Sequence, residues 1–172
     1  DYDAKLARTA ENNGFEYALS QVRYEASYGA EYQHESTSFS LALLLATERL
    51  KVIAAVHPGL WQPAVLAKLG ATADQISGGR FAVNVVSGWF KDEFTHLGEP
   101  WLEHDERYRR SAEFLQVIRK IWTEDNVDFR GDFYRIHDFT LKPKPLNTVE
   151  RPNPELFQGG NSTAARRNGG RH

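Results

Sequence analysis

The sequence places polar residues within or directly after stretches that are typical of buried strands. His57 follows the apolar run 50–56, and Ser87 follows the run 81–86, which also contains Asn84. In parallel α/β proteins the ligand site lies at the C-terminal ends of the strands. The residues expected to contact a ligand are therefore His57, Asn84, Ser87, Gly159, Gly160, Asn161 and Ser162.

The segment 158–162 ends a short predicted strand and opens a helix with two glycines and two small polar residues. Backbone N–H groups and a hydroxyl would converge there, and the helix dipole would stabilise a phosphate. An ordinary glycine turn followed by an N-cap explains the same pattern. Because a full dinucleotide-binding fingerprint is absent, the residue pattern leaves both interpretations open.

Asn84 lies inside a strand made otherwise of Val, Ala and Phe. An unpaired amide there would cost about 1–3 kcal/mol, so a partner is expected. A ring edged with carbonyl and nitrogen groups, such as a flavin, would satisfy the amide, and so would the end of a neighbouring strand. His57, which precedes Pro58, is similarly either a site residue or a histidine that caps a loop.

His104 and Tyr108 stand four residues apart at the start of a predicted helix. That spacing puts them on one face, where both can reach the same oxygen. The alternative is a charged first turn in which Asp105 and Glu106 complement the helix dipole. The six histidines are dispersed and form neither a His-x3-His nor a His-Glu-x2-His pair, so no metal site is predicted.

The composition narrows the classes of partner. The net charge is −2 and the 21 basic residues are scattered, so neither nucleic acid nor an anionic membrane is expected. There is no cysteine, which excludes disulfides and thiolate sites. No apolar run approaches the roughly 18–20 residues of a membrane span, and no signal peptide is evident. We expect a cytoplasmic protein that acts on a small molecule; with no Met, the chain is expected to begin inside a longer protein.

Strands and helices alternate along most of the chain. The pattern predicts one domain over residues 1–172, with a parallel α/β sheet that is either doubly wound or part of a β/α barrel. A complete barrel needs eight strands and about 250 residues, so at most half of one is expected. Predicted strands are 15–19, 50–56, 81–86 and 155–158; predicted helices are 2–13, 38–47, 62–76, 105–123 and a start at 164–168; 90–104 is a predicted loop and 127–135 a hairpin.

The order of four motifs resembles the bacterial luciferase-like, reduced-flavin-dependent monooxygenases. Within that family, residues 89–94 and the proline-rich stretch 143–154 are most similar to the dimethylsulfone monooxygenases, followed by the alkanesulfonate monooxygenases. The resemblance covers essentially the whole chain. Its motifs are Val56-His57-Pro58-Gly59, Ile76-Ser77-Gly78-Gly79-Arg80 running into Asn84-Val85-Val86-Ser87-Gly88, His104-Asp105-Glu106-Arg107-Tyr108, and Gln158-Gly159-Gly160-Asn161-Ser162.

The resemblance implies an incomplete TIM (β/α)8 barrel, about strands 2 to 5, that binds reduced FMN. Asn84 and Ser87 would lie beside the isoalloxazine or ribityl chain, and His57 is a further candidate at its strand end. The residues implied around the FMN phosphate are His104, Tyr108, Gly160, Asn161 and Ser162. Asn161 departs from the sulfonate enzymes, where a second serine is common, and the segments that hold substrate residues in relatives are missing, so catalytic residues are not assigned.

The implied activity is that of a two-component monooxygenase. Reduced FMN would come from a separate NAD(P)H-dependent flavin reductase and, with O₂, oxidise a small organosulfur compound. Dimethylsulfone, giving methanesulfinate and formaldehyde, is the expected substrate, and a homo-oligomer is the expected assembly. The alternatives are an alkanesulfonate monooxygenase, a deazaflavin-dependent oxidoreductase and a non-catalytic flavin-binding relative.

Overall fold

Four parallel strands form the main sheet, in the order β1-β2-β3-β6. The structure is a computed structural model that describes residues 2–27, 29–160 and 166. Its strands are β1 (Tyr17–Ser20), β2 (Lys51–Val56), β3 (Phe81–Val85) and β6 (Glu155–Gln158), with an antiparallel hairpin of β4 (Val127–Arg130) and β5 (Arg135–Phe139). Its helices are α1 (Tyr2–Asn12), α2 (Ser36–Ala46), α3 (Pro63–Ser77), α4 (Lys91–His96) and α5 (His104–Thr123).

Local signals explain where the helix between β2 and β3 begins and ends. The Gln62 side chain accepts a hydrogen bond from the backbone N–H of Val65 at 2.9 Å, and Pro63 occupies the first turn, where its missing N–H is harmless. Gly78 ends α3 in the left-handed conformation, with φ 68°. The helix predicted over 62–76 is confirmed, with each end shifted by one residue.

Most predicted elements are present with shifts of one or two residues at their ends, and the strand 155–158 has the predicted bounds. One prediction is wrong: the segment 90–104, expected to be a loop, contains α4. This helix is short, and it is stabilised by burial of Phe94 and Glu93, both 0% exposed. Their burial depends on contacts with distant segments, so no local sequence pattern predicts it. The helix start predicted at 164–168 falls outside the described residues, apart from Arg166.

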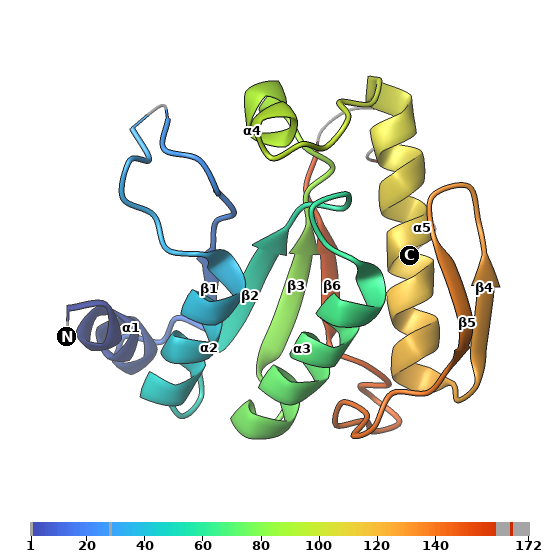
Figure 1. Cartoon of the computed structure of the whole chain (residues 1–172). Coiled ribbons are helices and arrows are strands. Elements are labelled where there is room, and N and C mark those ends of the chain that lie inside the picture. The colour runs from blue at the N-terminus through green and yellow to red at the C-terminus, as the bar shows by residue number, and fades with distance from the viewer. Residues whose placement is uncertain (1, 28, 161–165, 167–172) are drawn as a thin grey trace.

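The core lies between one face of the sheet and the helices. Alternate residues of β2 and β3 point toward α3 and α5, which pack side by side (Figure 1). Trp122 of α5 is 1% exposed and donates its indole N–H to the Ala67 carbonyl at 2.9 Å. The strand residues of this core are Val52, Ala54, Val56, Phe81, Val83 and Val85.

The opposite face of the sheet is concave. The Tyr17 hydroxyl on β1 donates to Glu155 Oε2 on β6 at 2.8 Å, although β2 and β3 lie between them. In a flat sheet these two strands would stand about 14 Å apart. Helices on one face and a strongly curved sheet are the geometry of a β/α barrel wall, not of a doubly wound sheet. The predicted α/β fold of barrel type is confirmed, as a four-stranded portion.

Candidate functional site

The C-terminal ends of the strands meet at one edge of the sheet. Val85 at the end of β3 pairs with Gln158 at the end of β6, and Val56 at the end of β2 pairs with Val85. The segments that follow these strands therefore leave the sheet together, beneath α4 and beside the N-terminal end of α5 (Figure 1). This edge is where parallel α/β folds bind ligands.

His57 is 2% exposed and joins three elements at this edge. Its Nδ1 lies 2.8 Å from the Val86 carbonyl, so the Nδ1–H donates there. Its Nε2 faces Glu93 Oε2 of α4 at 3.6 Å. Because both ring nitrogens face protein groups, the structure places His57 as a residue that positions the loops after β2 and β3.

Glu93 anchors the loop after β1 as well as α4. Its Oε1 accepts hydrogen bonds from the backbone N–H groups of Tyr24, at 2.6 Å, and Glu25, at 3.2 Å. Burial would raise the pKa of Glu93, but His57 and these two N–H groups outweigh it and hold the pKa below its ordinary value of 4.5. Glu93 is therefore a buried carboxylate that faces the His57 imidazole.

Ser87 connects the end of β3 to α5. Its hydroxyl lies 2.8 Å from the Ser111 hydroxyl, and Ser111 donates its own proton to the Arg107 carbonyl at 3.0 Å. Ser87 must then be the donor to Ser111, because each hydroxyl carries one proton. Ser87 is 4% exposed, so its first structural role is to hold this strand end against the helix.

Asn84 lies on the concave face, one residue before the end of β3. Its side chain is half-buried and makes no hydrogen bond with the described residues. A Cβ placed on Gly159, the residue after β6, would come 3.9 Å from both the Asn84 Oδ1 and Nδ2 atoms. The amide is thus available to a ligand that lies across the ends of β3 and β6.

The end of β6 supplies a further amide. Gln158 has Nε2 and Oε1 atoms that are both buried and that find no hydrogen-bond partner in the described part of the chain. Gly159 and Gly160 after it are exposed, and Gly160 has φ 141°, a conformation that side chains rarely adopt. Asn161 and Ser162, which complete the predicted phosphate motif, lie outside the described residues.

His104 and Tyr108 share one face of the first turns of α5, as predicted. Their ring centroids are 5.0 Å apart, with the planes tilted by 49°. The His104 Nδ1 lies 2.9 Å from the Asp105 carboxylate, which leaves Nε2 as the ring atom turned away from that pair. The structure thus brings together the two side chains that were singled out by their spacing.

Three residues at this edge were missed by sequence reasoning. Glu93 and Gln158 were not singled out because their roles arise only when distant segments pack together. Arg23, 7% exposed, follows β1 in the long loop and was not distinguished there from other charged residues. Only their positions in the sequence could have indicated them: Arg23 and Glu93 lie within ten residues after a strand, and Gln158 is the last residue of a strand.

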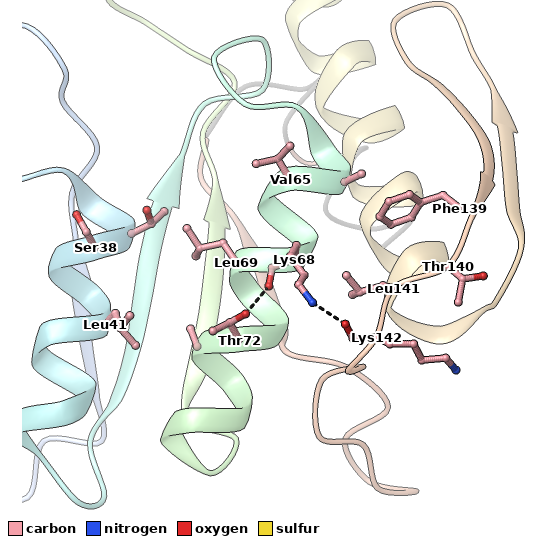
Figure 2. Close-up of a pocket in the computed structure, with 13 residues that line it drawn as sticks. Ser38, Leu41, Val65, Lys68, Leu69, Thr72, Phe139, Thr140, Leu141 and Lys142 are labelled. Atoms are coloured by element: carbon pink, nitrogen blue, oxygen red, sulfur yellow. Dashed lines mark hydrogen bonds between the residues drawn. The ribbon is translucent and has the colours of Figure 1, made fainter.

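A large apolar groove lies away from this edge, on the outward side of the helices. It has a volume of about 730 Å³ and runs between α2, α3 and the end of the hairpin, as Figure 2 shows. Leu41, Leu69, Phe139 and Leu141 line it, and Lys68 donates from its far wall to the Lys142 carbonyl at 2.5 Å. It contains none of the predicted site residues, so its size does not mark the ligand site.

Within residues 2–27, 29–160 and 166, no three His, Asp or Glu side chains converge as metal ligands would. None of the helices that the structure describes combines the length and the apolar run of a membrane crossing.

A curved parallel sheet with polar groups gathered at its C-terminal edge defines a β/α-barrel protein with a small-molecule site. The chain belongs to the luciferase-like monooxygenase family, whose model matches residues 1–172. It is 66% identical over 166 residues to an FMNH₂-dependent dimethylsulfone monooxygenase from Pseudomonas putida, and 63% identical to one from Pseudomonas fluorescens (strain Pf0-1), in each case over 96% of the chain.

A solved structure shows the same fold. The EDTA monooxygenase EmoA from Chelativorans sp. BNC1 superposes with a TM-score of 0.85 at 19% identity, over 96% of this chain and 45% of its own. The chain spans 45% of the P. putida relative and 44% of the P. fluorescens relative. What the chain shares with these proteins is therefore a portion of their length.

Proposed function

We propose that this chain is the flavin-holding portion of a two-component monooxygenase that uses reduced FMN and O₂ to oxidise a small organosulfur compound, dimethylsulfone being the preferred candidate. The observation that carries the proposal is the match to two FMNH₂-dependent dimethylsulfone monooxygenases at 66% and 63% identity. Reduced FMN, when bound, supplies the two electrons that convert one atom of O₂ to water while the other enters the substrate. The balanced outcome is methanesulfinic acid, formaldehyde, water and oxidised FMN.

The polar groups at the strand ends fit the chemistry of FMN. Asn84 offers an amide on the concave face, where the edge of the isoalloxazine presents carbonyl and ring nitrogen groups. Ser87 and His57 fix the loops on either side of it through their contacts with Ser111 and Glu93. The role proposed for these groups is to bind and orient the ring, with Asn84 in direct contact.

The phosphate end of FMN fits the neighbouring edge. Gly159 and Gly160 are exposed after β6, and the Gln158 amide beside them is buried without a partner. His104 and Tyr108 stand at the N-terminal end of α5, where the helix dipole favours an anion. We assign the phosphate to these residues together with Asn161 and Ser162.

The concave face itself suits an aromatic ring and a small substrate. Leu19 of β1 is 59% exposed and Phe157 of β6 is 40% exposed, and both point to that face according to the strand register. Apolar side chains left open at a ligand site exclude water when the ligand covers them. This chain would thereby protect the reacting centre from water.

The test of the cofactor assignment is an anaerobic titration of the intact protein with reduced FMN. Asn84→Ala is expected to weaken binding by roughly tenfold, the loss of one hydrogen bond, and Tyr108→Phe by roughly 10- to 100-fold, because its acceptor is charged. Asn147→Ala and Tyr32→Phe, exposed positions that are not among the proposed site residues, are matched controls that should bind as the parent does. Equal affinities for all five proteins would contradict the assignment.

The proposed partners are a separate NAD(P)H-dependent flavin reductase and a second copy of the chain. Exposed apolar side chains on α2 and α3, including Leu45 at 66% and Val65 at 58%, support self-association. Light scattering of the intact protein is expected to give a mass of two or more subunits. A mass equal to one subunit across the micromolar range would contradict it.

A further inference from the structure

Arg23 is a buried cation that has no polar partner among the residues the structure describes. It follows β1 by three residues, is 7% exposed, and has an Nε atom sealed from solvent without a hydrogen bond. In the described part of the chain the guanidinium forms neither an ion pair nor a hydrogen bond. Burying a charge in this state is unfavourable unless a partner binds to it.

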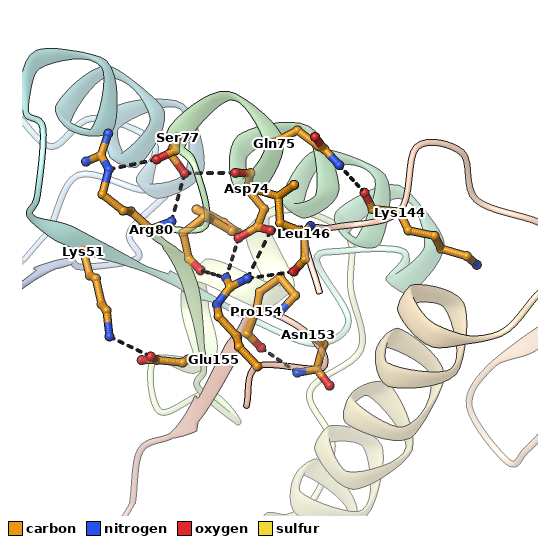
Figure 3. A network of polar contacts seen from close by, with 12 residues as sticks. Lys51, Asp74, Gln75, Ser77, Arg80, Lys144, Leu146, Asn153, Pro154 and Glu155 are labelled. Carbon is orange, nitrogen blue, oxygen red and sulfur yellow. Dashed lines mark hydrogen bonds and ion pairs between the residues drawn. The ribbon is translucent and has the colours of Figure 1, made fainter. Parts of the chain in front are cut away.

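Arg80 shows what a purely structural arginine looks like in this protein. Its Nε donates to the Ser77 carbonyl, and its two terminal nitrogens donate to the Thr47 hydroxyl and to the carbonyls of Leu44, Thr47 and Leu50, all within 2.8–3.2 Å. Figure 3 shows its contact with Ser77. All five N–H donors of Arg80 are thus used inside the fold, whereas those of Arg23 are not.

Two aromatic rings hold the Arg23 guanidinium in place. Its Cζ lies 4.8 Å from the centroid of Trp89 and 5.1 Å from that of Phe90, and these residues follow β3. Ring faces attract a cation but accept no directed hydrogen bond of carbonyl strength. The Nε is buried, whereas the terminal nitrogens are not sealed, so they are the atoms that can reach a ligand.

The position of Arg23 relates it to the proposed flavin site. The next residue, Tyr24, is fixed by Glu93, which also faces His57 at the end of β2. Arg23 therefore bridges the loops after β1 and β3 at the open end of the concave face. Trp89, 59% exposed, and Leu19, 59% exposed, leave apolar surface around it.

We infer that Arg23, held by Trp89 and Phe90, binds a sulfonyl oxygen of the substrate. Sulfonyl oxygens only accept hydrogen bonds, and a guanidinium only donates them, in a fork that matches two oxygens on one atom. The methyl groups of a sulfone would contact the exposed ring of Trp89. This inference rests on the proposed function. It makes Arg23 a residue that would select organosulfur oxides, because their oxygens accept the hydrogen bonds that its guanidinium donates.

The test uses the intact protein with FMN bound and two ligands, neutral dimethylsulfone and anionic methanesulfonate, in calorimetric titrations. Arg23→Met is expected to weaken binding of the natural ligand class by roughly 10- to 100-fold, the effect of losing a charge-assisted hydrogen bond. Arg23→Lys should recover part of this, because it keeps the charge and loses the fork. Arg109→Met, which removes a charge at an exposed position, is the matched control and should bind as the parent does.

Flavin titration and turnover separate the possible results. Reduced FMN should bind Arg23→Met within about twofold of the parent, which also shows that the variant is folded, and the loss in turnover with a reductase should be mainly in KM. Unchanged sulfone and sulfonate binding, or an equal loss of FMN affinity, overturns the inference. Ligand binding through Arg23 without reductase-dependent turnover by the parent supports the inference and overturns the proposed function. A loss confined to methanesulfonate identifies the anion, not the sulfone, as the ligand.

Discussion

Glu93→Ala is expected to destabilise the intact protein by about 2–4 kcal/mol, because it removes a buried carboxylate that faces His57, and a buried polar group left without its partner costs about 1–3 kcal/mol. Glu93 and His57 have side chains 1% and 2% exposed, with Nε2 and Oε2 3.6 Å apart. The change also removes the acceptor of the Tyr24 and Glu25 backbone N–H groups. Urea unfolding of the parent and the variant measures the difference.

Glu93→Gln separates the charge from the hydrogen bonds. The amide oxygen can still accept from Tyr24 and Glu25, so this variant should be more stable than Glu93→Ala and less stable than the parent. Glu106→Ala is the control, since Glu106 is 43% exposed and pairs with Arg109 on the surface of α5. If Glu106→Ala cost as much as Glu93→Ala, burial of the pair would not be the cause.

The same residue gives a pH dependence with a definite sign. The folded-state pKa of Glu93 lies below its ordinary value of 4.5, so its contribution to stability is fully present above about 4.5 and is lost as the pH falls through the folded-state value. The parent should lose its advantage over Glu93→Gln as the pH is lowered below about 4.5. An advantage that persisted unchanged at lower pH would contradict the assignment of a buried carboxylate.

Asp74→Ala is expected to cost about 3 kcal/mol, at the lower end of the range for buried pairs, because Arg151 keeps 23% of its surface in water. Asp74 is 0% exposed on α3 and pairs with both terminal nitrogens of Arg151; Figure 3 shows the cluster. It also accepts the backbone N–H of Leu146 at 2.8 Å. One side chain thus docks the proline-rich segment that leads into β6.

The consequence of Asp74→Ala should be local as well as global. Because the docked segment leads directly into β6, the amides of β6 are expected to exchange with solvent faster in the variant, while those of β2 change less. Hydrogen-exchange mass spectrometry on the intact protein measures this. Asp125→Ala is the control, as Asp125 is 48% exposed and pairs with Lys142 and Lys144 near the surface. Faster exchange in both variants would contradict a specific role for Asp74.

Arg151, the partner of Asp74, contacts β3 as well. Arg151 also donates to the Leu146 carbonyl at 3.0 Å and to the Phe81 carbonyl at 3.4 Å, so it ties the segment to the first residue of β3. Each single change leaves the other member of the pair without its partner, whereas the double change of Asp74 and Arg151 removes both charges. The double change should therefore cost less than the sum of the single changes. Additive losses would show that the two side chains act independently.

The sequence by itself determined most of the elements and their order, with α4 as the exception. Strands β2, β3 and β6 were predictable because a parallel strand is covered on both faces and therefore appears in the sequence as a short, mostly apolar run. Helix α3 was predictable because Pro63 and Gly78 mark its two ends. Local spacing also placed His104 and Tyr108 on one face of α5, since four residues make about one helical turn. These are properties that residues close in the chain decide among themselves.

Only the tertiary structure decided what the polar residues at the strand ends contact. His57 and Ser87 were predicted as ligand residues from position, and the fold engages them with Val86, Glu93 and Ser111. Among the residues that the structure describes, it leaves the Gln158 amide without a hydrogen-bond partner and holds Arg23 between two rings. A side chain's partners come from segments up to 138 residues away, as with Tyr17 and Glu155, and sequence spacing carries no record of which distant segments pack together.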